Sequence, residues 1–88
     1  MNTNSAALAQ LLNKNYTEAR TTLSRIPQPD ATTAYLKAIL AARTHQAADV
    51  VTNLEQAFKL DSALKARAAK DLEFANYFNT ADFQNITK

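Results

Sequence analysis

The sequence contains no glycine and no cysteine among its 88 residues. Phosphate-binding loops, dinucleotide-binding turns and nucleophile elbows need glycine at positions where a side chain would clash. Without cysteine the chain forms no disulfide, no thiol nucleophile and no thiolate metal site. These two absences exclude several large classes of enzyme and leave the redox compartment open.

Charge of one sign and long apolar runs are also scarce. Ten Lys and Arg face eight Asp and Glu, which gives a net charge of +2. The densest basic stretch, residues 59–70, is interrupted by Asp61, whereas a nucleic-acid binder concentrates its basic residues on one face. No apolar run approaches the roughly 18 residues of a membrane span, and the first residues lack the basic segment of a signal peptide. We expect neither a membrane span nor a signal peptide.

Alanine dominates what is present, with 18 of the 41 apolar and aromatic residues. Alanine is the strongest helix former, and the only prolines are Pro27 and Pro29, so the composition predicts an all-α fold. Apolar residues recur at helical spacing along most of the chain. The helices predicted from this spacing cover about residues 2–12, 15–26, 30–43, 47–60, 62–72 and 80–86.

Several helix ends can be predicted from residue type. Asn15 followed by Glu18 is the pattern of a capping box at the second helix. In the turn 13–15, asparagine is expected to take the left-handed conformation that glycine usually supplies, and His45 is expected to do so in the next turn. Asp61 or Ser62 is expected to cap the fifth helix, and Thr80 the last one.

The centre and the end of the core also follow from the pattern. The helix predicted at about residues 30–43 is apolar nearly all round, so it should lie between neighbours at the middle of the domain. Leu64, Ala68 and Leu72 are the predicted apolar positions of the fifth helix. Four of the seven aromatic residues lie within ten residues near the C-terminus and should close the core; they are Phe74, Tyr77, Phe78 and Phe83.

Two segments of the chain match each other at one fixed displacement. Residues 16–26 align with residues 47–57, so that Leu23 falls on Leu54, and Ala7 falls on Ala38 in the preceding helices. We call this displacement, from Ala7 to Ala38, the repeat register. A period of roughly 31–34 residues is typical of stacked helical pairs, because one pair cannot bury its apolar face alone. The repeat register has a length of this kind.

With these residues the chain resembles the tetratricopeptide repeat family. The resemblance is carried by Tyr16, Ala19, Leu23 and Ile26 in the first unit, and by Ala38, Val50, Leu54, Ala57, Leu60 and Asp61 in the second. Residues 71–86 are similar to the segment that closes the last repeat in many bacterial members. The resemblance implies an all-α, right-handed superhelix of antiparallel helix pairs. It implies one domain over residues 1–88, with repeats at about 1–27 and 31–61 and a C-terminal cap at about 62–88.

The resemblance also implies a non-enzymatic module that binds a peptide or partner subunit in the groove lined by the first helix of each pair. Carried over to this sequence, the groove residues are Asn4, Leu8, Leu12, Thr32, Tyr35, Ile39 and Arg43. For each residue, contact with the core or another repeat is the alternative to ligand contact. Members that clamp a peptide C-terminus place Lys, Arg and Asn at several of these points, and only Asn4 and Arg43 are similar here. Bacterial members occur in the cytoplasm and in the cell envelope, so the compartment stays open.

Two other roles remain as alternatives. The chain could self-associate or cap the end of a larger repeat protein through its first helix, whose apolar residues have few covering partners upstream; these are Leu8, Leu11 and Leu12. A weaker alternative is binding of RNA or an acidic partner by a basic surface, although no aromatic residue is interleaved there to stack on bases. Its residues are Arg43, Lys65, Arg67 and Lys70.

No motif in the sequence predicts catalysis, a cofactor or a metal. His45 is the only histidine, and Asp49 four residues later is too little to hold an ion. The serines have no base in a recognisable pattern, and the nearest paired carboxylates, Glu55 with Asp61 and Asp71 with Glu73, fit helix starts and solvated faces. We expect no enzymatic activity.

Overall fold

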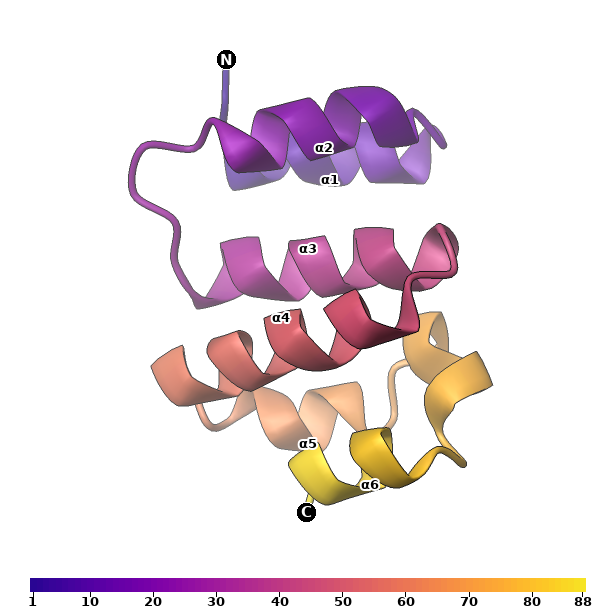
Figure 1. The fold of residues 1–88 in the computed structure, drawn as a ribbon. Coiled ribbons are helices and arrows are strands. Elements are labelled where there is room, and N and C mark those ends of the chain that lie inside the picture. The colour runs from indigo at the N-terminus through magenta and orange to yellow at the C-terminus, as the bar shows by residue number, and fades with distance from the viewer.

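A computed structural model describes residues 1–88 and contains helices without any strand (Figure 1). The expected all-α class is therefore confirmed. The helices follow one another from the N-terminal to the C-terminal end of the molecule, and none is long and apolar enough to cross a bilayer. Their bounds are α1 Asn4–Leu12, α2 Tyr16–Ser24, α3 Ala31–Arg43, α4 Ala47–Leu60, α5 Leu64–Ala68, the 3-10 helix η1 Leu72–Tyr77 and α6 Ala81–Ile86.

Helix α3 is the centre of the molecule, as its all-round apolar pattern predicts. Nine of its 13 residues are buried, and it packs against α1, α2, α4 and η1. Its largest contact is with α4, whose apolar residues recur at helical spacing along one face. A helix with neighbours on several sides can bury apolar residues around most of its circumference.

Several positions that the repeat register aligns are buried in both units. Ala7 and Ala38 are both 0% exposed, and Leu23 and Leu54 are 2% and 0% exposed. Small residues such as the two alanines let consecutive helices approach closely. The internal similarity of the sequence is thus matched by the packing of the two helix pairs.

The turn between α1 and α2 and the turn between α3 and α4 have the same geometry. Lys14 and His45, which the repeat register aligns, are the only non-glycine residues with positive φ, at 62° and 60°. One residue later, the amide of Asn15 donates to the carbonyl of Gln10 at 2.8 Å, and the amide of Gln46 donates to Ala41 at 2.9 Å. This six-residue closure around a left-handed residue is a Schellman motif. The prediction for His45 is confirmed.

For the first turn the prediction is wrong, because the left-handed residue is Lys14 and neither of its asparagine neighbours. The helix ends at Leu12, and the Schellman closure fixes which residue takes positive φ, whatever its type. The capping box of Asn15 and Glu18 is also absent. Glu18 would have to accept the amide of Asn15, which already donates to Gln10. A capping box forms instead at α3, between Asp30 and Thr33.

The C-terminal third differs from the expected pattern in its helix bounds. Helix α5 covers only Leu64–Ala68, its N-cap is Ala63 rather than Asp61 or Ser62, and Leu72 is 81% exposed. Asp61 still contributes, because its carboxylate accepts the amide of Ala63 at 3.1 Å. Thr80 caps α6 as predicted, accepting from the amide of Phe83.

The aromatic cluster near the C-terminus closes the core, as predicted. Phe74 and Phe83 are 0% and 2% exposed, with their ring centroids 6.0 Å apart. The ring centroids of Phe78 and Phe83 are 5.6 Å apart, and Tyr77 is partly buried and packs against the hydrophobic core. Helices η1 and α6 therefore contribute Phe74 and Phe83 to the hydrophobic core.

Candidate functional site

A groove of about 260 Å³ lies between α1, α3 and α5, and we call it the α1–α3–α5 groove. Five of the seven groove residues predicted from the sequence lie in it together. Leu12 and Arg43 are not among its lining residues. The complete lining is Asn4, Ser5, Leu8, Thr32, Tyr35, Leu36, Ile39, Leu64 and Arg67.

The floor of the groove is apolar and its rim is partly open. Tyr35, Leu36 and Ile39 of α3 are 2%, 6% and 7% exposed, so they form a largely covered floor. Leu8 of α1 is 43% exposed and forms one wall. Leu64 of α5, which is partly buried, belongs to the opposite wall. The apolar surface offered to a ligand is thus aliphatic, at Leu8 and Leu64, while the Tyr35 ring lies covered beneath it.

Tyr35 is held from two sides. Its hydroxyl donates to a carboxylate oxygen of Asp71 at 2.7 Å, and its ring meets Phe74 edge-on at 5.6 Å and 79°. Burial, followed by the hydrogen bond to Asp71, raises the pKa of Tyr35 well above its usual range. The residue therefore supports the core and the groove floor at once.

Arg67 is the one cation in the lining, and sequence reasoning assigned it only to the alternative basic surface. Its guanidinium carbon lies 4.7 Å from the centroid of the Tyr35 ring, a cation–π contact. It has no ion-pair partner, because the chain has a single ion pair, between Arg43 and Glu73. Leu64 and Arg67 were missed because they lie on α5, outside the two repeats; their spacing of three residues on one helix face was the available signal.

The side chain of Asn4, on the α1 side of the groove, is hydrogen-bonded to other residues of the chain. Its side-chain nitrogen donates to Asp30 at 3.0 Å, and its side-chain oxygen accepts from the hydroxyl of Thr33 at 2.8 Å. The amide of Thr33 and then the Asn4 side chain, both donating to the carboxylate, lower the pKa of Asp30. This network ties the start of α1 to the start of α3.

The guanidinium of Arg43 also has its hydrogen-bond partners within the chain. Its guanidinium forms two parallel bonds to the carboxylate of Glu73, at 2.9 and 2.6 Å, and donates to the carbonyl of Leu11 at 2.7 Å. The hydrogen bond to Glu73 raises the pKa of Arg43 further above its usual range. Arg43 thus joins the ends of α1 and α3 to η1, and both residues that resembled a carboxylate clamp already have internal partners.

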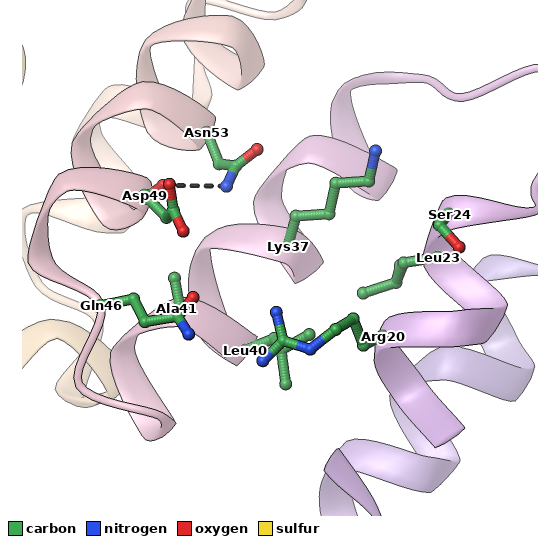
Figure 2. A pocket seen from close by; sticks show the side chains of 9 residues that line it. All are labelled: Arg20, Leu23, Ser24, Lys37, Leu40, Ala41, Gln46, Asp49 and Asn53. Atoms are coloured by element: carbon green, nitrogen blue, oxygen red, sulfur yellow. Dashed lines mark hydrogen bonds between the residues drawn. The ribbon is translucent and has the colours of Figure 1, made fainter. Parts of the chain in front are cut away.

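A second hollow, of about 150 Å³, lies between α2, α3 and α4 on a different set of residues (Figure 2). Arg20 and Lys37 belong to it, but their charged ends point in different directions, so they do not converge on one ligand atom (Figure 2). Asp49 adds a carboxylate to the same lining, and Asn53 donates to the backbone of Asp49 at 2.8 Å. Because the lining carries charges of both signs and these charges do not point at one place, this hollow is the weaker candidate for a ligand site.

Comparison of the chain with known protein families, with characterised proteins and with solved structures found no match in any of the three. The tetratricopeptide repeat family therefore remains a prediction from the sequence.

Proposed function

We propose that this chain is a non-enzymatic interaction module of the tetratricopeptide repeat type, which binds a peptide or partner subunit in the α1–α3–α5 groove. The observation that carries the proposal is the convergence of five independently expected residues on one apolar groove. Three helices supply its walls and floor, and Leu8 leaves apolar area open to a partner. Burial of such area is the main source of binding free energy in peptide recognition.

The superhelical arrangement belongs to the same proposal. Two observations support two copies of one helix–turn–helix unit. Ala7 and Ala38, which the repeat register aligns, are both fully buried, and the left-handed turn recurs at Lys14 and His45. Helix α5 then takes the position of the first helix of a third pair. The groove is then lined by the first helix of each pair, α1, α3 and α5, and by none of the intervening helices.

Leu8→Asp is the variant that tests the groove. Tyr35 and Arg43 are poor choices, because removing either side chain would damage the core or the ion pair with Glu73. Leu8 is 43% exposed, so Leu8→Asp places a charge on the groove wall without opening the core. Leu60→Asp is the matched control, since Leu60 is 54% exposed and lies outside the groove.

The measurement is selection of a random displayed peptide library on each chain. Three helices packed about 10 Å apart span about 20 Å, which an extended peptide of about six residues crosses. We expect the unmodified chain and Leu60→Asp to enrich the same peptides and Leu8→Asp to lose them. Equal enrichment on all three chains, or on none of them, would contradict groove binding.

Self-association is the second candidate, and two exposed leucines favour it. Leu12 is 64% exposed and Leu72 is 81% exposed, whereas Leu11, expected to lack covering partners, is 1% exposed. Leu12 shares one face of α1 with Leu8, which lies four residues earlier and is 43% exposed, and a contiguous exposed apolar patch of this kind is typical of contacts between subunits. A mass that rises with concentration, and that Leu12→Glu returns to the monomer value, would support this candidate.

A further inference from the structure

We propose that the ligand of the α1–α3–α5 groove is an acidic peptide, in which one Asp or Glu side chain pairs with Arg67 beside an apolar residue packed on Leu8. The inference rests on the proposed function and specifies the chemistry of its ligand. It comes from Arg67, the one charged side chain in the groove lining, which forms no ion pair within the chain.

Two carboxylates, those of Asp30 and Asp71, are hydrogen-bonded to residues of the groove lining. Asp30 accepts from Asn4 and from the amide of Thr33, at 3.0 Å each. Asp71 accepts from the hydroxyl of Tyr35 and from the amide of Glu73, and Glu73 itself pairs with Arg43. None of them forms an ion pair with Arg67 and none belongs to the lining, whose one charged side chain is Arg67, so the groove presents a positive charge that an acidic group complements.

Arg67 is also held in place for such a contact. Its guanidinium lies over the Tyr35 ring at 4.7 Å, and that ring is fixed by Asp71 and Phe74. A guanidinium that contacts a ring through its face keeps N–H groups at its edge free to donate, in a geometry that matches a carboxylate. Less side-chain entropy is lost on binding when the donor is already ordered.

The surroundings of Arg67 favour a peptide over a nucleic acid. The lining contains one cation, whereas nucleic-acid affinity depends on several cations that each neutralise a phosphate. Tyr35, the only aromatic in the groove, is 2% exposed and covered by Arg67, so it offers no face for base stacking. The apolar walls at Leu8 and Leu64 fit an aliphatic side chain next to the acidic one.

A charge reversal in the peptide selection tests the proposal. We expect the unmodified chain to enrich peptides with Asp or Glu next to an apolar residue, and Arg67→Glu to enrich Lys or Arg at that place. Lys59→Glu is the matched control, because it makes the same change of charge on α4, outside the groove, and should keep the acidic peptides. Far-UV circular dichroism of each variant verifies that the helices are intact.

One enriched peptide then gives a quantitative test by fluorescence polarisation. Changing its acidic residue to the amide should weaken binding to the unmodified chain about fivefold, as expected for one partly exposed charge pair, and should not change binding to Arg67→Gln. Amidation of the peptide C-terminus should leave binding unchanged, which separates a side-chain carboxylate from a terminal one.

The outcomes separate the two levels of the proposal. Enrichment of the same acidic peptides by the unmodified chain and by Arg67→Glu would overturn the pairing with Arg67 and leave groove binding intact. Loss of binding on C-terminal amidation, or displacement of the peptide by a single-stranded RNA oligonucleotide, would overturn the ligand class. Failure to enrich any peptide that depends on Leu8 would overturn the proposed function, and the ligand assignment with it.

Discussion

The hydroxyl of Tyr35 donates a hydrogen bond of 2.7 Å to the carboxylate of Asp71, 36 residues further along the chain. The bond joins the central helix α3 to the residue that caps η1. Because the same Tyr35 ring forms the floor of the α1–α3–α5 groove and supports Arg67, the groove and the C-terminal cap share one anchoring residue. Changes in the cap will therefore alter the groove.

Tyr35→Phe should lower the free energy of unfolding by about 1 kcal/mol, because it removes one hydrogen bond and keeps the ring in place. The buried contact with Phe74 is retained, so the loss should be much smaller than for Tyr35→Ala, about 3–5 kcal/mol for removal of a buried aromatic side chain. Urea unfolding of the three chains measures both differences. A cost for Tyr35→Phe as large as that for Tyr35→Ala would contradict this account of the hydroxyl.

The same substitution should change stability at alkaline pH. The folded pKa of Tyr35 is raised above the ordinary value of 10.0, so the unfolded chain loses the phenolic proton first. The stabilisation is complete below pH 10 and falls as the pH rises above it toward the folded pKa. Unfolding curves between about pH 9 and 11 should show a steeper loss for the unmodified chain than for Tyr35→Phe. Parallel curves would contradict the raised pKa.

Arg43 and Glu73 should be energetically coupled. Their side chains are 23% and 29% exposed, and the two parallel bonds restrict both side chains to one geometry. A double-mutant cycle with Arg43→Met and Glu73→Gln should give a coupling free energy of about 1 kcal/mol. Arg43→Met alone should lower the free energy of unfolding more than Glu73→Gln alone, because it also removes the bond to the carbonyl of Leu11. A coupling energy near zero would show that the pair contributes no stability.

Lys14→Gly and His45→Gly should each stabilise the protein by about 0.5–1 kcal/mol. Both residues have φ near 60°, where a Cβ atom is unfavourable and glycine is not. The two turns are separate sites, so the gains should add. Thermal unfolding of the single and double variants measures this, with Lys14→Ala as a control that should bring no gain. Lower unfolding temperatures for both glycine variants would contradict the strain assigned to these turns.

Acid stability should depend on Asp30. Its folded pKa is lowered below the ordinary value of 3.8, so its stabilising contribution is complete above that value and is lost as the pH falls through the folded pKa. Asp30→Asn keeps a capping side chain without this titration and should flatten the loss of stability below about pH 4. Unfolding at acid pH can be followed by circular dichroism. The same loss of stability below about pH 4 in Asp30→Asn and in the unmodified chain would contradict the prediction.

Most helices could be predicted because their determinants are local. The apolar periodicity of α4, the two prolines before α3 and the cap at Thr80 all act within a few residues. The repeat register was also visible in the sequence, since small residues recur at the same buried positions, as with Ala7 and Ala38.

The remainder depended on contacts between distant segments. Arg43 was expected in the groove, but Glu73, 30 residues away, occupies its guanidinium. Asn15 was expected to share a capping box, but its amide had already been used by the preceding helix. Arg67 lies in the groove because α5, which packs against α4, places its guanidinium over the Tyr35 ring of α3, and residue spacing in the repeats does not reveal this.

The position of α3 determines which parts of the molecule unfold locally. It contacts elements from both ends of the chain, so fraying of α1 and α2, or of η1 and α6, leaves it covered on the other side. Its backbone amides should therefore exchange with deuterium last and at a rate close to that of global unfolding, while the terminal helices exchange through smaller openings. A ligand that spans α1, α3 and α5 would suppress those smaller openings, and the pattern of slowed exchange would report its footprint.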